Sequence, residues 1–406
     1  MNKSTRKLLV IGHVWPQPKA SAAGEHMLHL IQLFKDMCYQ VHFATAAQQP
    51  PNYSDLDTID IITDFIELNN DNFNDYLLKV SPDVVLFDRF MVEEQFSWRV
   101  KQVCPNALRV LDTEDIHFLR KERELNFKGK INEGLSDIAK REISSIYRCD
   151  LSLVISEFEI DLLTKEYAIP QSLLCYLPLL SNEIKLEDSF SFNERKDVMF
   201  VGNFLHEPNW QAVQTLKKEI WPLVRKQNKE LQLHIYGAYA AEKHKQLNNP
   251  KENFYVHGYI DDIEAVIKKT RLLVAPIYIG AGQKGKLLKA MQCGTPSITT
   301  NIGVESMQFE KEWPGVIADD FEIFTKQLLK IYSDKTYWEK KQRNILPLVN
   351  EHFQYKNYLP ILDDRLNLLF EQKEKLRAKN IIGEILWHNS MRSTEFMSRW
   401  IMEKNK

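Results

Sequence analysis

The sequence predicts an α/β protein built from two Rossmann-like domains, each with a parallel sheet covered by helices. Two observations support this fold class. Short apolar segments typical of buried parallel strands alternate with helical segments along most of the 406 residues. In addition, the arrangement at residues 8–12, an apolar strand that ends in glycine before a proline-bearing loop and a helix, returns at residues 198–202.

The first domain is expected to comprise residues 1–183. Its first strand is the apolar run at residues 8–12, which is followed by a loop over residues 13–24 and a helix over residues 25–36. Apolar runs predict further strands at residues 41–44, 59–65, 84–87, 108–111 and 151–155. Helices are predicted at residues 73–80 and 93–103, and in a long polar region that extends to residue 147.

A polar and acidic stretch between residues 178 and 196 is the best candidate for a linker, so the second domain is expected at residues 184–357. Its strands are predicted at residues 198–202, 231–236, 254–257, 272–275 and 297–300. The loops after the strands of each sheet should meet at one edge, where such folds bind ligands. Residues 358–406 are predicted to be helical with a break near Lys379. Their apolar stripe either packs onto the body or lies on a membrane surface.

Composition excludes several functional classes. The 53 Lys and Arg residues balance 55 Asp and Glu residues, so charge gives no reason to expect a nucleic-acid partner. The five cysteines are scattered without metal-binding spacing, which favours buried thiols in a reducing compartment. The apolar run at residues 8–11 is too short for a signal peptide, and no window approaches 18 uncharged apolar residues. We therefore expect a cytoplasmic protein, with peripheral contact at the inner face of the membrane left open.

A glycine-rich loop after the strand at residues 272–275 has the clearest chemical pattern. Before the next helical segment it holds three glycines and two lysines, Gly280, Gly282, Lys284, Gly285 and Lys286. Glycines let backbone N–H groups approach a ligand, the helix N-terminus favours negative charge, and lysines add full positive charges. The pattern predicts a diphosphate cradle. The alternative is a tight strand-to-helix turn whose lysines are only solvated.

Four stretches of the second domain resemble the group-1 glycosyltransferases, family 4 of the retaining enzymes with the GT-B fold. They are FVGNFLHEPNWQAV at residues 200–213, VHGYIDDI at 256–263, LLVAPIYIGAGQKGKLLKAMQCGTPSITT at 272–300 and IGVESM at 302–307. The first domain resembles the family more loosely, through the loop at Gly24 and through residues 111–124.

The resemblance implies two Rossmann-like domains that face a central cleft, with C-terminal helices that cross back toward the N-terminal domain. It implies transfer of a sugar from a nucleoside diphosphate-sugar, UDP- or GDP-linked, to a glycan, lipid-linked or protein acceptor in envelope glycan assembly. Retention of configuration is likewise implied, and no cofactor or metal is expected. The oligomeric state is left open.

The resemblance also assigns donor-binding residues. In the second domain these are Gly202, Asn203, His206, Gly282, Lys284 and Lys286. Lysines suit this role because the departing nucleoside diphosphate gains negative charge while the sugar becomes oxocarbenium-like. Asp55 and Asp57 spell the acidic pair of metal-dependent glycosyltransferases of another fold, but they lack that context, so no metal site is predicted.

Two glutamates that are common in the family are absent, since their positions hold Ala281 and Lys289. Glu305 is the remaining acidic residue in a comparable loop, and we predict that it binds the ribose hydroxyls of the donor. The substitutions leave open a catalytically inactive GT-B protein that binds a glycan or a partner enzyme. A nucleotide-sugar epimerase on the same fold is a third hypothesis.

The densest ionisable cluster of the first domain follows the strand at residues 108–111. We predict catalytic roles for His117, which would support the acceptor hydroxyl or the donor sugar, for Asp115 as proton acceptor, and for Lys284. The acceptor side of the cleft is predicted to include His13, Gly24, Asp112 and Arg120. The alternative for this cluster is a structural helix start in which Asp112 and Thr113 cap the following turn.

Overall fold

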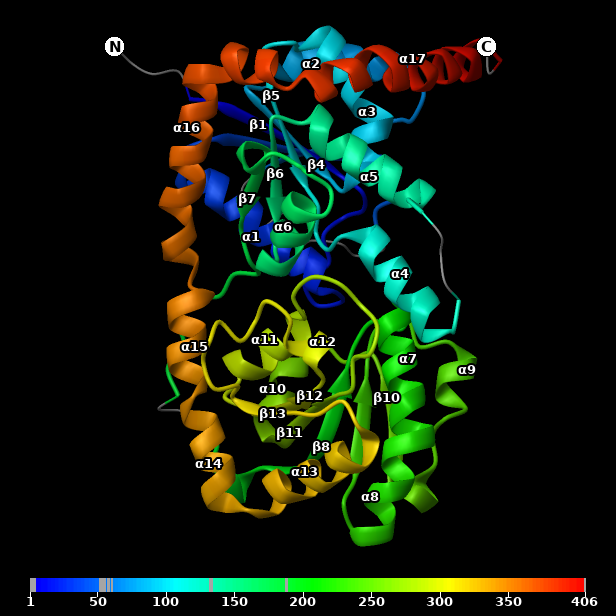
Figure 1. Cartoon of the computed structure of the whole chain (residues 1–406), viewed down its shortest axis with the longest axis vertical. Helices are drawn as coiled ribbons and strands as arrows, with labels where there is room; N and C mark the ends of the chain where they lie inside the picture. The colour runs from blue at the N-terminus through cyan, green and yellow to red at the C-terminus, as the bar shows by residue number, and fades with distance from the viewer. Residues whose placement is uncertain are drawn as a thin grey trace.

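The computed structural model describes residues 5–50, 56, 59, 61–130, 134–186 and 189–404. These residues form two lobes along the long axis of the molecule, each built around one parallel sheet (Figure 1). The last strand of the first sheet ends at Tyr176 and the first strand of the second begins at Lys196. The predicted domain boundary at residues 183 and 184 lies between them. The acidic pair Asp55 and Asp57 falls outside the described residues.

The N-terminal lobe has a seven-stranded parallel sheet in the order β3-β2-β1-β4-β5-β6-β7. Its strands are β1 (Lys7–Gly12), β2 (Gln40–Thr45), β3 (Ile62–Phe65), β4 (Val84–Asp88), β5 (Leu108–Asp112), β6 (Leu151–Val154) and β7 (Leu174–Tyr176). The central strands β4 and β5 are buried at every residue because helices cover both faces of the sheet. The six strands predicted from sequence are confirmed. Strand β7 was not predicted.

Six helices complete the N-terminal lobe: α1 (Ala22–Asp36), α2 (Asn72–Val80), α3 (Phe90–Val103), α4 (His117–Phe127), α5 (Asp137–Arg148) and α6 (Glu157–Lys165). The long polar region that was predicted to be helical contains two helices, α4 and α5. Gly24 was assigned to a loop, but it lies in the first turn of α1, where the Ser21 side chain accepts a hydrogen bond from the Gly24 N–H. Ser21 is therefore the N-cap, a signal that precedes the apolar periodicity of the helix.

The C-terminal lobe has a six-stranded parallel sheet in the order β10-β9-β8-β11-β12-β13. The strands are β8 (Lys196–Val201), β9 (Leu233–Tyr236), β10 (Phe254–Gly258), β11 (Thr270–Ala275), β12 (Ser297–Thr299) and β13 (Gly315–Ile317). The helices are α7 (Glu207–Thr215), α8 (Trp221–Gln227), α9 (Glu242–Lys245), α10 (Ile263–Lys269), α11 (Gly285–Gln292), α12 (Asn301–Val304), α13 (Phe321–Ser333), α14 (Lys335–Arg343) and α15 (Ile345–His352). The five predicted strands are present, and the short β13 was missed.

Each sheet has one point where the order of its strands reverses. The reversal lies between β1 and β4 in the N-terminal lobe and between β8 and β11 in the C-terminal lobe. In open parallel sheets, ligands bind outside the carboxyl ends of the strands at such a switch point. The loops that begin at His13, Arg89, Gly202 and Pro276 follow these four strands, so they are the ones that topology singles out for ligand binding.

The C-terminal segment returns to the N-terminal lobe, as expected. Helix α16 (Tyr355–Lys379) runs along one side of the N-terminal lobe, and α17 (Ile381–Lys404) lies across the far end of that lobe (Figure 1). Leu362 and Leu366 of α16 are fully buried in the core beneath the N-terminal sheet. Trp387 of α17 packs with Trp98 of α3. The predicted helix break near Lys379 is confirmed. Among the described helices, none is both long and apolar enough to cross a membrane.

The two lobes touch where α1 and α11 begin. A Cβ atom added at Gly285 would lie 2.3 Å from the Cβ of Ala22. We expect Gly285→Ala to lower the free energy of unfolding by about 1–3 kcal/mol, because the added methyl group has no space. The added substitution Ala22→Gly should restore most of the loss. Urea unfolding of the single and double variants measures both effects. An unchanged midpoint for Gly285→Ala would show that the two helix ends are apart in solution.

Candidate functional site

A cavity of about 730 Å³ lies between the two lobes. The N-terminal lobe lines it with the loop after β1, the start of α1 and residues after β4 and β5. The C-terminal lobe lines it with the loops after β8, β9 and β11. The cavity therefore joins the carboxyl ends of strands at both switch points, and its volume is typical of a small-molecule site.

Two lysines, buried Lys284 and partly buried Lys286, lie on the C-terminal side of this cavity. Burial lowers the pKa of Lys284 to about 8. Burial, together with the neighbouring charge of Lys284, lowers the pKa of Lys286 to about 7. The Lys286 ammonium donates to Asn209 Oδ1 at 2.5 Å, and the Lys284 ammonium donates to the carbonyl oxygens of Ala281, at 3.2 Å, and Gly282. Two poorly solvated ammonium groups that repel each other would be stabilised by an anion with several charges.

The N-termini of two helices converge on the same cavity. Helix α1 has 15 residues and α11 has eight, and both begin at the contact between Ala22 and Gly285. Ser21, Ala22, Gly285 and Lys286 all line the cavity. The positive ends of two helix dipoles therefore add to the lysine charges. The arrangement fits a diphosphate group.

Most of the sequence-predicted site residues come together here. Nine of them line the cavity: His13, Asp115, His117, Arg120, Gly202, Asn203, His206, Lys284 and Lys286. Gly24, Asp112, Gly282 and Glu305 do not. These four residues have structural contacts elsewhere.

Gly282 and Gly24 are sites of close packing. A Cβ atom at Gly282 would lie 2.8 Å from the Cβ of Asp115, and the Gly282 N–H donates to Glu159 Oε1 at 2.8 Å. A Cβ atom at Gly24 would lie 2.5 Å from the backbone nitrogen of Gln17. Both glycines therefore let chain segments approach closely, and neither faces the cavity.

Glu305 forms an ion pair across the lobes. Its two carboxylate oxygens accept hydrogen bonds from Arg123 at 2.8 and 2.7 Å, and Arg123 also donates to the carbonyl oxygen of Gly280 at 2.8 Å. The carboxylate is therefore engaged by a cation that also binds the glycine-rich loop. This geometry does not support the prediction that Glu305 binds a ribose.

The Asp115 carboxylate is paired with a cation. Both of its oxygens accept hydrogen bonds from Arg120. Burial opposes its ionisation, but the charge of Arg120 lowers the pKa of Asp115 to about 2. His117 Nε2 lies 3.8 Å from Asp115 Oδ1, and burial lowers the pKa of His117 to about 3. The geometry therefore offers a neutral imidazole to a bound molecule, whereas the paired carboxylate is a weak base.

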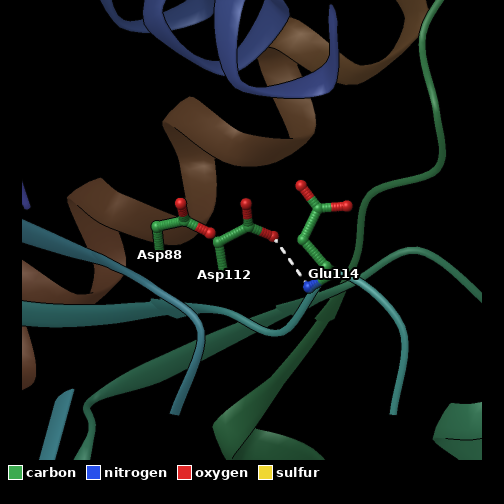
Figure 2. A group of neighbouring side chains, drawn as sticks. All are labelled: Asp88, Asp112 and Glu114. Atoms are coloured by element: carbon green, nitrogen blue, oxygen red, sulfur yellow. Dashed lines mark hydrogen bonds between the residues drawn. The ribbon is translucent and has the colours of Figure 1, made fainter. Parts of the chain in front are cut away.

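Three carboxylates lie together beside the cavity, at the carboxyl ends of β4 and β5 (Figure 2). They belong to Asp88, Asp112 and Glu114, and one oxygen from each lies within 4.8 Å of the others. The Glu114 N–H donates to Asp112 Oδ1 at 3.2 Å. Glu114 lines the cavity, but Asp112 is fully buried below it. The predicted contact between Asp112 and an acceptor is therefore corrected to a structural role.

Neighbouring groups already balance the charge of this acidic cluster. His26 Nε2 of α1 lies 3.5 Å from Asp112 Oδ1, and Arg89 Nε lies 3.4 Å from Asp88 Oδ1. Burial and the Asp112 charge raise the pKa of Glu114 to about 8, so Glu114 is largely protonated at neutral pH. The three carboxylates have the spacing of a cation site, but His26, Arg89 and one proton satisfy their charge.

Sequence analysis missed Arg89 and Glu114, which both line the cavity. Both have backbone φ angles in the left-handed region, 75° at Arg89 and 53° at Glu114. Such angles in residues other than glycine cluster at functional sites. The sequence carries no direct signal of these backbone angles. Both residues, however, lie shortly after the end of a predicted strand.

The pairing of His26 with Asp112 should make stability depend on pH. Burial alone would lower the pKa of His26, but the Asp112 carboxylate raises this pKa from 6.5 to about 9. The stabilisation is therefore complete below about pH 6.5 and is lost as pH rises through about 9. We expect His26→Asn to cost about 3–5 kcal/mol at pH 6. Urea unfolding should show a smaller cost near pH 9.5, and an equal cost at both values would contradict the ion pair.

Comparisons with known proteins agree with this architecture. Residues 195–334, which span the second sheet and α13, match the family model described as Glycosyl transferases group 1. A curated protein, the uncharacterized 44.6 kDa protein in the cps region of Klebsiella pneumoniae, is 24% identical over 224 residues. That match covers 53% of this chain and 55% of the relative, so the chain spans about half the length of the curated protein it matches.

Solved glycosyltransferase structures share the fold over nearly the whole chain. Sucrose-phosphate synthase from Thermosynechococcus elongatus has a TM-score of 0.72 at 16% identity and covers 90% of this chain and 99% of its own. Anabaena Alr3699/HepE in complex with UDP and glucose has a TM-score of 0.65 at 12% identity, and the match covers 89% of this chain and 99% of the Anabaena chain. The lipopolysaccharide outer core galactosyltransferase WaaB has a TM-score of 0.56 at 13% identity, and the match covers 88% of this chain and 99% of the WaaB chain.

The protein has the GT-B fold, and its second lobe is similar to the group 1 glycosyltransferases. The predicted fold and the resemblance to group 1 glycosyltransferases are confirmed, whereas family 4 and the retaining mechanism stay predictions.

Proposed function

We propose that this protein is a glycosyltransferase that transfers a sugar from a nucleoside diphosphate-sugar to a glycan, lipid-linked or protein acceptor. One observation carries the proposal: buried Lys284, partly buried Lys286 and the N-termini of α1 and α11 converge on one cavity between the lobes. This concentration of positive charge suits a diphosphate that becomes more negative as the sugar departs.

A UDP-sugar is the donor that the comparisons favour, because the Anabaena protein with the same fold was solved with UDP and glucose. The part of the cavity lined by Tyr239, Tyr259 and Ile263 offers aromatic and apolar surface for a base. The names of the Klebsiella cps-region protein and of WaaB support envelope glycan assembly as the process. A cytoplasmic location remains a prediction.

The chemistry we propose needs no metal, and it proceeds with retention of configuration, as the family resemblance implies. Lys284 and Lys286 stabilise the leaving diphosphate. Neutral His117 exchanges hydrogen bonds with the sugar or the acceptor hydroxyl, and Arg120 holds Asp115 in place. A carboxylate with a pKa of about 2 is a weak base. The departing phosphate is therefore the better acceptor for the hydroxyl proton.

Calorimetry with UDP, GDP and ADP tests donor binding. We expect one of them to bind in the presence of EDTA, and Lys286→Met to weaken that binding about 10- to 100-fold, since a hydrogen bond to a charged group is lost. Lys326→Met, at an exposed position on α13, is the matched control and should change nothing. If none of the three nucleotides binds, the proposed function fails.

The same titrations should show proton uptake. The pKa values of about 7 for Lys286 and about 8 for Lys284 should rise when a diphosphate binds, so protons are taken up near pH 7.5. Affinity should therefore fall as pH rises from about 7 to about 9. Titration in buffers of different ionisation enthalpy measures the uptake. An affinity that is constant over this range would contradict a role for the lysines.

Turnover separates transfer from the alternatives. With donor and acceptor present, sugar transfer should persist in EDTA. NMR should show a product of retained anomeric configuration. The Lys284→Ala substitution should abolish transfer. The alternative of an inactive GT-B protein, motivated by Ala281 and Lys289, predicts donor binding without transfer or hydrolysis. A nucleotide-sugar epimerase would instead form product without any acceptor.

A further inference from the structure

Lys289 holds an ion pair network that spans the two lobes. Its ammonium donates to Glu25 Oε1 at 2.7 Å and to Glu264 Oε1 at 3.0 Å. Glu25 belongs to the first turn of α1 in the N-terminal lobe, whereas Glu264 belongs to α10 in the C-terminal lobe. One cation of α11 is therefore shared by carboxylates from both lobes.

Glu25 and Lys289 line the cavity. Lys289 follows Gly285, the first residue of α11, by four residues, and a helix rises about 1.5 Å per residue, so Lys289 lies about 6 Å farther along the axis. Ile263 and Ile267 of α10 line the neighbouring wall, which also holds Tyr259. The pair thus lies between the diphosphate cradle and the apolar wall.

That intermediate place matches the order of groups in a nucleoside diphosphate. The ribose joins the phosphates to the base, so a diphosphate at the start of α11 and a base on the apolar wall put the ribose beside Glu25 and Lys289. The 2′- and 3′-hydroxyls of a ribose are hydrogen-bond donors, and an ionised carboxylate is the strongest acceptor that a protein side chain offers them.

Glu25 is also the acidic group best able to accept those bonds. Among the described residues that line the cavity, the acids are Glu25, Glu114 and Asp115. Asp115 is occupied by Arg120, and Glu114 lies with Asp112 in the acidic cluster on the N-terminal side. Glu25 Oε1 is bound by Lys289, and no side-chain or backbone donor within hydrogen-bond distance of Glu25 Oε2 is found in the part of the chain that the structure describes.

We propose that Glu25, oriented by Lys289, is the carboxylate that binds the ribose hydroxyls of the donor nucleotide. This inference rests on the proposed function and deepens it. The N-terminal lobe then completes the nucleotide site of the C-terminal lobe. Glu25 takes the role that sequence analysis gave to Glu305. Lys289 is a positioning residue that holds the Glu25 side chain.

The test compares UDP with 2′-deoxy-UDP and 3′-deoxy-UDP by calorimetry on the full chain. For the unmodified protein we expect UDP to bind about 10-fold or more tightly than at least one deoxy analogue, as for a hydrogen bond to a charged group. In Glu25→Ala this ratio should fall to about 2-fold or less, because both forms then lack the bond. Lys289→Met should reduce the ratio in the same direction.

Glu264→Gln is the matched control, since it removes the other partner of Lys289 and leaves Glu25 in place. The ratio should stay at its original value in this variant. If Glu25→Ala weakens UDP and its deoxy analogues equally, Glu25 only joins the lobes, and the proposal is overturned. The same holds if the unmodified protein does not discriminate among the three ligands. Failure of every nucleoside diphosphate to bind would overturn the proposed function as well, so the two failures are distinguishable.

Discussion

The contact between the first residues of α1 and α11 determines where chemistry takes place in this molecule. Gly285 has no side chain, so Ala22 can approach to a distance that no Cβ would allow. Two helix N-termini from separate lobes therefore face one cavity, and their dipoles add. Such a junction of positive ends is unfavourable without an anion, which is why a ligand of several negative charges fits the closed arrangement of the lobes better than a neutral one.

Charge separation within the cavity follows from this constraint. The C-terminal side holds two lysines with lowered pKa values, whereas the N-terminal side has a carboxylate cluster balanced by His26 and Arg89. Burial makes both sides of the cavity sensitive to the charge of a bound ligand, since an unbalanced charge in a poorly solvated place costs several kcal/mol. An anionic donor beside the lysines, and a hydroxyl beside neutral His117, leave no charge unpaired.

The fold could be predicted from sequence because buried parallel strands have strong local signatures. Only strands of three residues, such as β7 and β13, escaped. The lysines of the glycine-rich loop were found because glycine, lysine and helix start are adjacent in the chain. Glu305 was misplaced, because its partner Arg123 is 182 residues away, and no local pattern shows which carboxylates an opposite lobe will neutralise.

Lys289 shows what is overlooked when one lobe is compared with a family without the residues that face it from the other lobe. Sequence analysis treated a lysine in place of a common glutamate as the loss of an acid, and an inactive protein followed as an alternative. The structure supplies an acid from the other lobe, since Glu25 lies 2.7 Å from the Lys289 ammonium. A charge reversed on one lobe and compensated on the other keeps a carboxylate at the cavity.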